Sequence, residues 1–288
     1  MHILCYLARK RNLPVTKGFR KNYVTIEKKE HPTLRVLELA IGYGSKGATS
    51  VVSQDISFAL PAGQLCAIVG VNGIGKSTLL RTLGNLQPPL SGSICIDGRE
   101  LHTYGPEELA AKLGMVLTEP LASKNMTVME LIALGRFPYT NWLGRLSKQD
   151  REAIDHCVAQ TELGDLRHKK CHELSDGQLQ RVHIARAMAQ NTPLILLDEP
   201  TTHLDLHHKV QILKLLKHLA HQQSKTIVFT THEIDLAIQL CDRILVLDGA
   251  KNPFGQPCEL ISEKAFDRLF PQDSIAFDAR SGSFKIKK

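Results

Sequence analysis

The sequence lacks any hydrophobic run long enough to cross a membrane. Its longest apolar runs, at residues 65–71 and 194–197, fall well short of the ~20 apolar residues that a spanning helix needs. The N-terminus also lacks the pattern of a secretory signal, because its short apolar run at residues 3–8 precedes the basic residues instead of following them. We therefore expect no export, and any membrane role would require a partner.

Cysteine pairs are missing as well. The seven cysteines include no Cys-x-x-Cys pair, and a chain of 288 residues can bury a full core without disulfide bonds. This cysteine usage fits reduced thiols in a cytoplasm.

Excess charge is confined to the first 30 residues. They hold eight Lys or Arg against two Glu, whereas the rest of the chain is nearly neutral, with 28 basic and 27 acidic residues. Residues 1–33 are therefore predicted to form a basic, flexible extension. Contact with a membrane surface or with nucleic acid is the less favoured interpretation of these charges, and we expect no nucleic-acid partner.

From residue 34 onward, short apolar runs alternate with longer amphipathic segments, which is typical of an α/β protein with a largely parallel sheet. The clearest helix spans residues 205–223, and residues 127–190 are predicted to be a mostly helical insertion with a capping box at Ser147. Beyond residue 255 we expect a short helix near residues 258–269 and a hairpin at residues 274–286, with no assigned chemistry. Strands are predicted at residues 36–41, 56–60, 65–70, 93–96, 114–117, 194–198, 226–230 and 243–247.

A glycine-rich loop follows the predicted strand at residues 65–70. It fits the pattern G-x-x-x-x-G-K-[ST] and leads into a helix predicted at residues 78–86. Its glycines let backbone N–H groups close around phosphate oxygens, Lys76 supplies a mobile cation, and Ser77 offers a hydroxyl to Mg²⁺. The sequence therefore predicts a site for a nucleoside triphosphate and Mg²⁺. The expected nucleotide-binding residues of this segment are Gly70, Asn72, Gly73, Gly75, Lys76, Ser77 and Thr78.

Two adjacent carboxylates, Asp198 and Glu199, follow the apolar run at residues 194–197. Open α/β sheets place ligands at the carboxyl ends of their strands. Asp198 is predicted to hold Mg²⁺, directly or through water. Glu199 is predicted to orient or deprotonate the attacking water, since phosphoryl transfer depends mainly on positioning and charge stabilisation.

Further motifs, in order along the chain, resemble those of ABC ATPases. They are the aromatic Tyr43, the signature segment 174–178 with Asp176 at the usual Gly position, the segment 200–205, and the Thr231–His232 pair. The resemblance implies a P-loop NTPase core of ABC type at residues 34–255, with a helical subdomain inserted at about 119–190 and a small N-terminal antiparallel β subdomain. Residues 256–288 would form an appendage.

The resemblance also implies roles for these residues. Tyr43 would stack on adenine, and His232 would act with Lys76 and Glu199 in catalysis by contacting the γ-phosphate.

The start of the signature helix suggests an anion site by itself. Ser175 is a good N-cap for a helix over residues 177–190, so N–H groups and a hydroxyl would point outward. In the family, Ser175, Gly177 and Gln178 would close over the γ-phosphate held by a second copy, with Asp205 in the D-loop. The resemblance thus implies a head-to-tail dimer.

One position departs from the family pattern. A Gln that touches Mg²⁺ is expected after the strand at residues 114–117, but Thr118 stands there, followed by Glu119. We hypothesise that Thr118 or Glu119 takes over the metal contact.

The segments 125–131, 135–139 and 142–147 resemble the helical subdomain of importers for iron-siderophore complexes, haem and vitamin B12. This resemblance implies an ATP-hydrolysing subunit at the cytoplasmic face of the membrane. Its partners would be two transmembrane permease subunits and, indirectly, a substrate-binding protein.

Several alternatives share these motifs. A soluble ABC ATPase, for example in iron-sulfur cluster assembly, is disfavoured because the sequence has no long coiled coil and no second cassette. The ATPase subunit of an exporter would differ mainly in its partner, and a non-hydrolysing phosphate-binding module would leave Glu199 and His232 unused. The His203 and His207 pair, like the group at residues 168–172, lacks the further ligands of a metal site.

Overall fold

The computed structural model describes residues 31–45, 48–118, 125–269, 275–278 and 281–286. The first 30 residues of the predicted extension and Glu119 lie outside the described residues.

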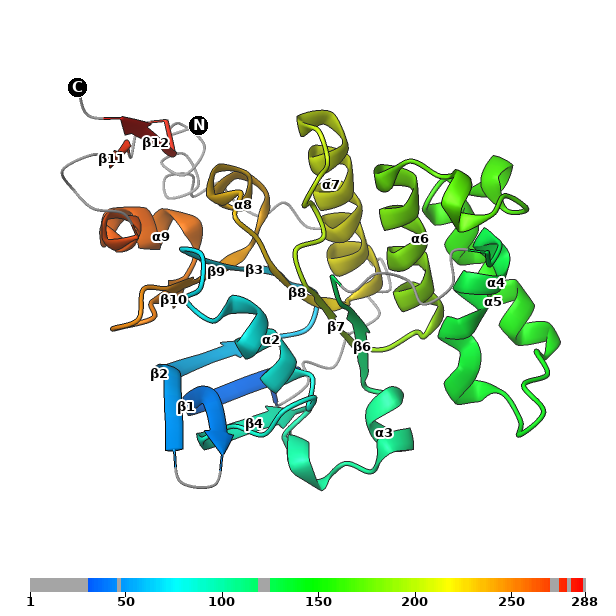
Figure 1. The fold of residues 1–288 in the computed structure, drawn as a ribbon, viewed down its shortest axis with the longest axis horizontal. Coiled ribbons are helices and arrows are strands. Elements are labelled where there is room, and N and C mark those ends of the chain that lie inside the picture. The colour runs from blue at the N-terminus through cyan, green and yellow to red at the C-terminus, as the bar shows by residue number, and fades with distance from the viewer. Residues whose placement is uncertain (1–30, 46–47, 119–124, 270–274, 279–280, 287–288) are drawn as a thin grey trace, which may run out of the picture. The chain divides into compact units, whose positions relative to one another are not determined.

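The predicted motif segments follow strands of a six-stranded sheet (Figure 1). Its strands from β9 to β6 are all parallel, so their carboxyl ends meet at one edge. The register pairs Leu197 with Phe229 and Ile68 with Thr230, so the segments that follow β7, β8 and β3 emerge side by side. The predicted bounds of these strands are confirmed to within one residue. In spatial order the sheet contains β10 (Phe254–Gly255), β9 (Arg243–Leu247), β3 (Leu65–Gly70), β8 (Thr226–Thr230), β7 (Leu194–Leu197) and β6 (Leu113–Val116).

A second sheet is antiparallel and confirms the predicted N-terminal β subdomain. Its order is β2 (Ala48–Leu60), β1 (Leu34–Ser45), β4 (Ser91–Ile96) and β5 (Arg99–Glu100). Both β1 and β2 extend well beyond the short strands that were predicted. The extension follows from small and polar residues that pair across the hairpin through several bulges, without the apolar alternation that marks a strand in sequence.

The two faces of the six-stranded sheet belong to different hydrophobic clusters. Along β3, Ala67 and Val69 point into one cluster and Cys66 and Ile68 into the other, as the two-residue period of a strand requires. The first cluster contains buried residues of α6 and α7, whereas the second contains α2 and the antiparallel sheet. The sheet is therefore covered on both sides, which explains why its strands are continuously apolar.

The predicted helical insertion is confirmed between residues 127 and 190. Each of its three α-helices begins with a capping box, at Thr127, Ser147 and Ser175. The insertion contains α4 (Val128–Ala133), the 3₁₀ segment η2 (Leu134–Tyr139), α5 (Lys148–Gln160), η3 (Gly164–Leu166), η4 (Cys171–Glu173) and α6 (Asp176–Ala189).

The remaining helices connect or flank the sheets. Within the described part of the chain, no helix combines the length and apolar character needed to cross a membrane. These helices are α2 (Lys76–Leu83), η1 (Leu101–Thr103), α3 (Pro106–Ala110), α7 (Leu206–Gln223) and α8 (Ile234–Leu240).

The C-terminal helix predicted near residues 258–269 is interrupted. It consists of α9 (Pro257–Ser262) and η5 (Ala265–Arg268), separated at Lys264, whose φ of 55° is left-handed. The predicted hairpin is formed by β11 (Ile275–Asp278) and β12 (Ser283–Ile286).

Candidate functional site

The glycine-rich loop joins the carboxyl end of β3 to α2. The helix begins at Lys76, two residues earlier than predicted, because Gly75 takes a left-handed φ of 107° and turns the chain directly into the helix. A Cβ atom at Gly75 would lie 2.4 Å from Val52 Cγ1, so only glycine fits there. Gly75 provides no capping side chain, which leaves the first-turn N–H groups of α2 free to bind an anion.

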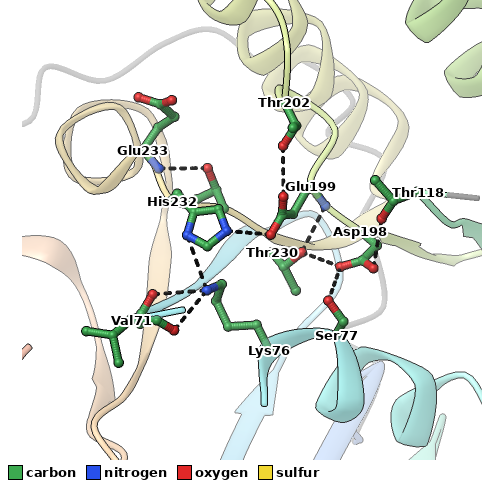
Figure 2. Close-up of polar contacts among 12 residues, drawn as sticks. Val71, Lys76, Ser77, Thr118, Asp198, Glu199, Thr202, Thr230, His232 and Glu233 are labelled. Atoms are coloured by element: carbon green, nitrogen blue, oxygen red, sulfur yellow. Dashed lines mark hydrogen bonds and ion pairs between the residues drawn. The ribbon is translucent and has the colours of Figure 1, made fainter. Parts of the chain in front are cut away.

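Lys76 is buried at the mouth of this loop (Figure 2). Its Nζ donates to the backbone carbonyls of Gly70 at 3.0 Å and Val71 at 3.2 Å, and lies 3.3 Å from His232 Nδ1. Burial lowers the pKa of Lys76, and the carboxylates of Glu199 and Asp198 oppose this shift. The ammonium is therefore held by neutral acceptors that a phosphate could replace.

Asp198 follows β7 and receives hydroxyl groups from three other segments. Its Oδ1 accepts from Ser77 Oγ at 3.0 Å and from Thr230 Oγ1 at 2.7 Å, while its Oδ2 accepts from Thr118 Oγ1 at 2.9 Å. One carboxylate and three hydroxyls make a set of hard oxygen donors, which suits Mg²⁺. Thr118 thus reaches the predicted metal site, through Asp198.

Glu199 combines an unusual backbone conformation with a side chain that contacts His232. Its φ of 46° is left-handed, which is uncommon for a residue with a side chain. Its Oε1 lies 2.5 Å from His232 Nε2, and its Oε2 accepts from Thr202 Oγ1 at 2.9 Å. Because a lysine ammonium can only donate, His232 Nδ1 accepts from Lys76 and the Nε2–H group donates to Glu199. A polar chain therefore runs from Lys76 through His232 to Glu199 (Figure 2).

Tyr43 lies on β1 of the antiparallel sheet. The residue is 60% exposed, and its hydroxyl is 3.1 Å from Thr78 Oγ1 in the first turn of α2. Asn72 and Gly73 are exposed at the tip of the loop. An exposed aromatic face therefore adjoins the phosphate loop, where a base could stack on it.

The signature segment is built as a capped helix start. Ser175 Oγ accepts from the N–H of Gln178 at 3.3 Å, and Gln178 Oε1 accepts from the N–H of Ser175 at 3.1 Å. Gly177 is buried in the first turn, and Asp205 caps the N-terminus of α7 by accepting from the His208 N–H at 2.9 Å. Ser175 itself is exposed.

The predicted residues thus fall into two groups. Among the described residues, no hydrogen bond or ion pair joins the signature group, defined as Ser175, Gly177, Gln178 and Asp205, to the site around Lys76 and Asp198. Each group is locally ordered by its own hydrogen bonds.

Three residues that contact the site were not singled out by the sequence. Thr230 bridges the Asp198 carboxylate and the Glu199 N–H, which donates to its Oγ1 at 2.9 Å. Thr202 fixes the Glu199 carboxylate, and His208 binds Asp205. Thr230 and Thr202 lie in or beside the motif segments, but neither residue type has a strong chemical signature by itself.

Comparison with known proteins gives consistent results. A family model described as "ABC transporter" matches residues 53–202. A probable siderophore transport system ATP-binding protein of Bacillus subtilis is 38% identical over 81% of this chain and 83% of its own length. An iron(3+)-hydroxamate import ATP-binding protein of the same species is 34% identical over 86% of this chain and 92% of its own. A dimeric ATP-binding cassette in a post-hydrolysis state with ADP and Pi superposes with a TM-score of 0.67 at 30% identity, covering 78% of this chain and 98% of that one.

Proposed function

The chain belongs to the ABC transporter family, whose ATP-binding subunits hydrolyse ATP to drive transport, and we propose that it powers import of a ferric siderophore complex, haem or cobalamin through separate permease subunits. The observation that supports ATP hydrolysis is the polar chain from Lys76 through His232 to Glu199, next to the Asp198 carboxylate. The solute class is extended from the relatives, as argued below.

The donor set around Asp198 fits a resident Mg²⁺. Ser77 and Asp198 would hold the ion, and Thr118 would act on it through the Asp198 oxygen to which it already donates. When bound, Mg²⁺ neutralises charge on the β- and γ-phosphate oxygens. Lys76 and the N–H groups of the loop would bind the same phosphates. Tyr43 would stack on the adenine ring.

Glu199 is the group that would accept a proton from the attacking water. Thr202 fixes one of its oxygens and His232 the other, so the carboxylate is oriented before substrate arrives. His232 carries its proton on Nε2 and has a lone pair on Nδ1, so contact with the γ-phosphate would require this N–H to turn from Glu199 to a phosphate oxygen. We expect Glu199→Gln to abolish hydrolysis while leaving ATP binding intact.

A second copy of the chain would complete each site. Cassettes of this family form dimers, and in this chain the signature group makes no described contact with its own phosphate loop. The exposed Ser175 hydroxyl and the N–H groups of residues 176 and 177, which the capping box does not use, would offer donors to an anion at this helix start. Two chains packed head to tail would place this site over the γ-phosphate held by the partner.

An exposed apolar surface on the helical insertion would bind the permease. Phe137 is 71% exposed and Trp142 91%, and Leu134 and Leu143 lie nearby along the chain with about half of their surface exposed. Tyr139 anchors this segment to the end of α6 by donating its hydroxyl to the Gln190 carbonyl at 2.8 Å. Exposed aromatic groups on one short segment are typical of a protein interface.

This arrangement and the relatives support import driven from the cytoplasmic face. One relative is named for import of iron(3+)-hydroxamate and another for siderophore transport. Their similarity covers most of both chains, including the helical insertion, so we extend the substrate class to this chain. A substrate-binding protein would deliver the solute to the permease, and this subunit would never touch it.

Reconstitution tests the proposal. The chain is purified with its permease subunits, placed in vesicles, and assayed for ATP hydrolysis with a binding protein loaded with a ferric siderophore, haem or cobalamin. We expect stimulation by one of these solutes and its loss in the Phe137→Ala, Trp142→Ala double variant. Leu37→Ala removes a side chain that is 48% exposed on β1 and serves as the control. Failure to co-purify with a membrane partner would favour a soluble ABC ATPase, and transport without a binding protein would favour an exporter.

A further inference from the structure

His208 joins two elements that the paired site needs. It is the third residue of α7, and Asp205 is the N-cap of that helix. Asp205 Oδ1 accepts from the His208 N–H at 2.9 Å, and Asp205 Oδ2 lies 2.8 Å from His208 Nδ1. Both oxygens of the D-loop carboxylate are therefore bound to one residue.

The other side of the His208 ring lies against the signature helix. A Cβ atom at Gly177 would be 3.0 Å from His208 Cδ2 and 3.4 Å from Cγ, which is tighter than ordinary van der Waals contact. Gly177 is buried, and only its missing side chain lets the ring approach the first turn of α6 this closely. The imidazole thus fills the space between the Asp205 carboxylate and the signature backbone.

A second contact joins the same helices one turn further along. Arg181 Nη2 donates to Gln211 Oε1 at 2.6 Å, and Gln211 Nε2 lies 2.8 Å from His207 Nε2. Residues 177 and 181 of α6 are spaced by one helical turn, as are residues 207 and 211 of α7. The two helices are therefore held in register along their N-terminal turns.

We propose that His208 is a positioning residue that holds the D-loop carboxylate and the signature helix at a fixed spacing, so that both meet the partner's nucleotide as one preformed surface. This inference rests on the head-to-tail dimer proposed above. His208 touches no residue of its own phosphate loop in the described contacts, so its effect should be confined to pairing of the chains. Preorganisation of a surface strengthens association because less ordering is required on contact.

A set of three substitutions separates the two contacts of the ring. His208→Asn keeps a donor near the position of Nδ1 but loses the ring over Gly177. His208→Phe keeps a ring but loses the donor, and His208→Ala loses both. His218→Ala, at an exposed position further along α7, is the matched control.

The experiment measures ATP-dependent dimerisation of the full chain in a Glu199→Gln background by sedimentation velocity. His208→Ala should weaken dimerisation about 5-fold for the hydrogen bond lost in each chain, which is the effect of one bond of ordinary strength, hence about 25-fold for a twofold dimer that holds two copies. His208→Phe should be nearly as weak and His208→Asn intermediate. ATP affinity of the monomer and the melting temperature should stay close to those of the parent. In the chain with Glu199 restored, His208→Ala should lower kcat with little change in KM for ATP.

Two results would overturn the inference. If the Glu199→Gln parent dimerises with ATP but His208→Ala dimerises equally well, or His208→Phe behaves like the parent, the Asp205 bond has no positioning role. If the parent itself does not dimerise with ATP, the paired site fails, and the inference fails with it.

Discussion

The ion pair between Arg136 and Asp150 anchors the proposed permease surface, and its removal should destabilise the helical insertion. Arg136 Nε donates to Asp150 Oδ1 at 2.8 Å, and Arg136 Nη1 donates to the Ala189 carbonyl at 2.8 Å. The guanidinium also stacks on Tyr139, with 4.0 Å from its carbon to the ring centroid. The side chains are only 11% and 4% exposed. One residue thus connects η2 to both α5 and α6.

The magnitude follows from what Arg136→Met leaves behind. Methionine has a similar length but no charge, so Asp150 Oδ1 and the Ala189 carbonyl lose their donors inside the protein. Breaking a buried ion pair costs ~3–5 kcal/mol of unfolding free energy. Asp150 keeps two hydrogen bonds, because its Oδ2 accepts from the Ser147 N–H at 2.9 Å and from the Ser147 hydroxyl at 2.6 Å. We therefore expect a loss of about 3 kcal/mol, which corresponds to a fall in Tm of roughly 6–12 °C for a domain of this size.

Thermal unfolding followed by circular dichroism measures this change. The double variant Arg136→Met, Asp150→Asn removes the unpaired charge and should recover at least half of the lost Tm, because the cost lies mainly in leaving one charge buried alone. Lys148→Met, in the exposed Lys148–Glu152 pair, is the control and should shift Tm by little. A fall below ~2 °C in Arg136→Met, or no recovery in the double variant, would refute the reasoning.

Two further predictions concern the metal site and pH. Thr118→Ala removes a donor to Asp198 Oδ2 and should raise the Mg²⁺ concentration for half-maximal nucleotide binding about 5-fold. Thr118→Ser keeps the hydroxyl and should have the midpoint of the parent chain. Equal midpoints in the parent and both variants would contradict the role of the hydroxyl. Burial lowers the pKa of His183 to about 4, from an unfolded value of ~6.5. As the pH is lowered from 6.5 to 4, the unfolded chain binds a proton before the folded chain does, so the free energy of unfolding decreases as the pH decreases. From pH 7 to pH 4.5 the loss should be about 2 kcal/mol in urea unfolding, and His183→Gln should lose less over the same range; equal losses would contradict this.

The core of the site was predictable because it depends on local pattern. The strand before the loop and the strand before Asp198 are buried on both faces, so each is a continuous apolar run that ends where the chemistry begins. The glycines of the loop and the Lys76–Ser77 pair follow from the demands of phosphate binding. These features require no knowledge of distant contacts.

The contacts that could not be predicted from the sequence depend on how distant segments pair and pack. Thr230 meets Asp198 only because β8 pairs with β7 so that Phe229 lies beside Leu197. His208 gains its contact with Gly177 from the packing of α6 on α7, and the long β1–β2 hairpin depends on paired small residues and bulges. The family pattern predicted that Thr118 stands beside the proposed metal site, and the structure adds that its hydroxyl donates to the Asp198 carboxylate.

In the proposed dimer, the signature group of one chain completes the phosphate loop of the other. Complementation between two inactive chains tests it most directly. A Lys76→Ala chain keeps its signature, and a Ser175→Arg chain keeps its phosphate loop, so a mixed dimer contains one intact site and one doubly defective site. We predict that each variant alone lacks ATPase activity and that an equal mixture recovers about a quarter of the wild-type rate, as random pairing into twofold dimers requires. No recovery in the mixture, with both chains folded and able to dimerise, would contradict the paired site.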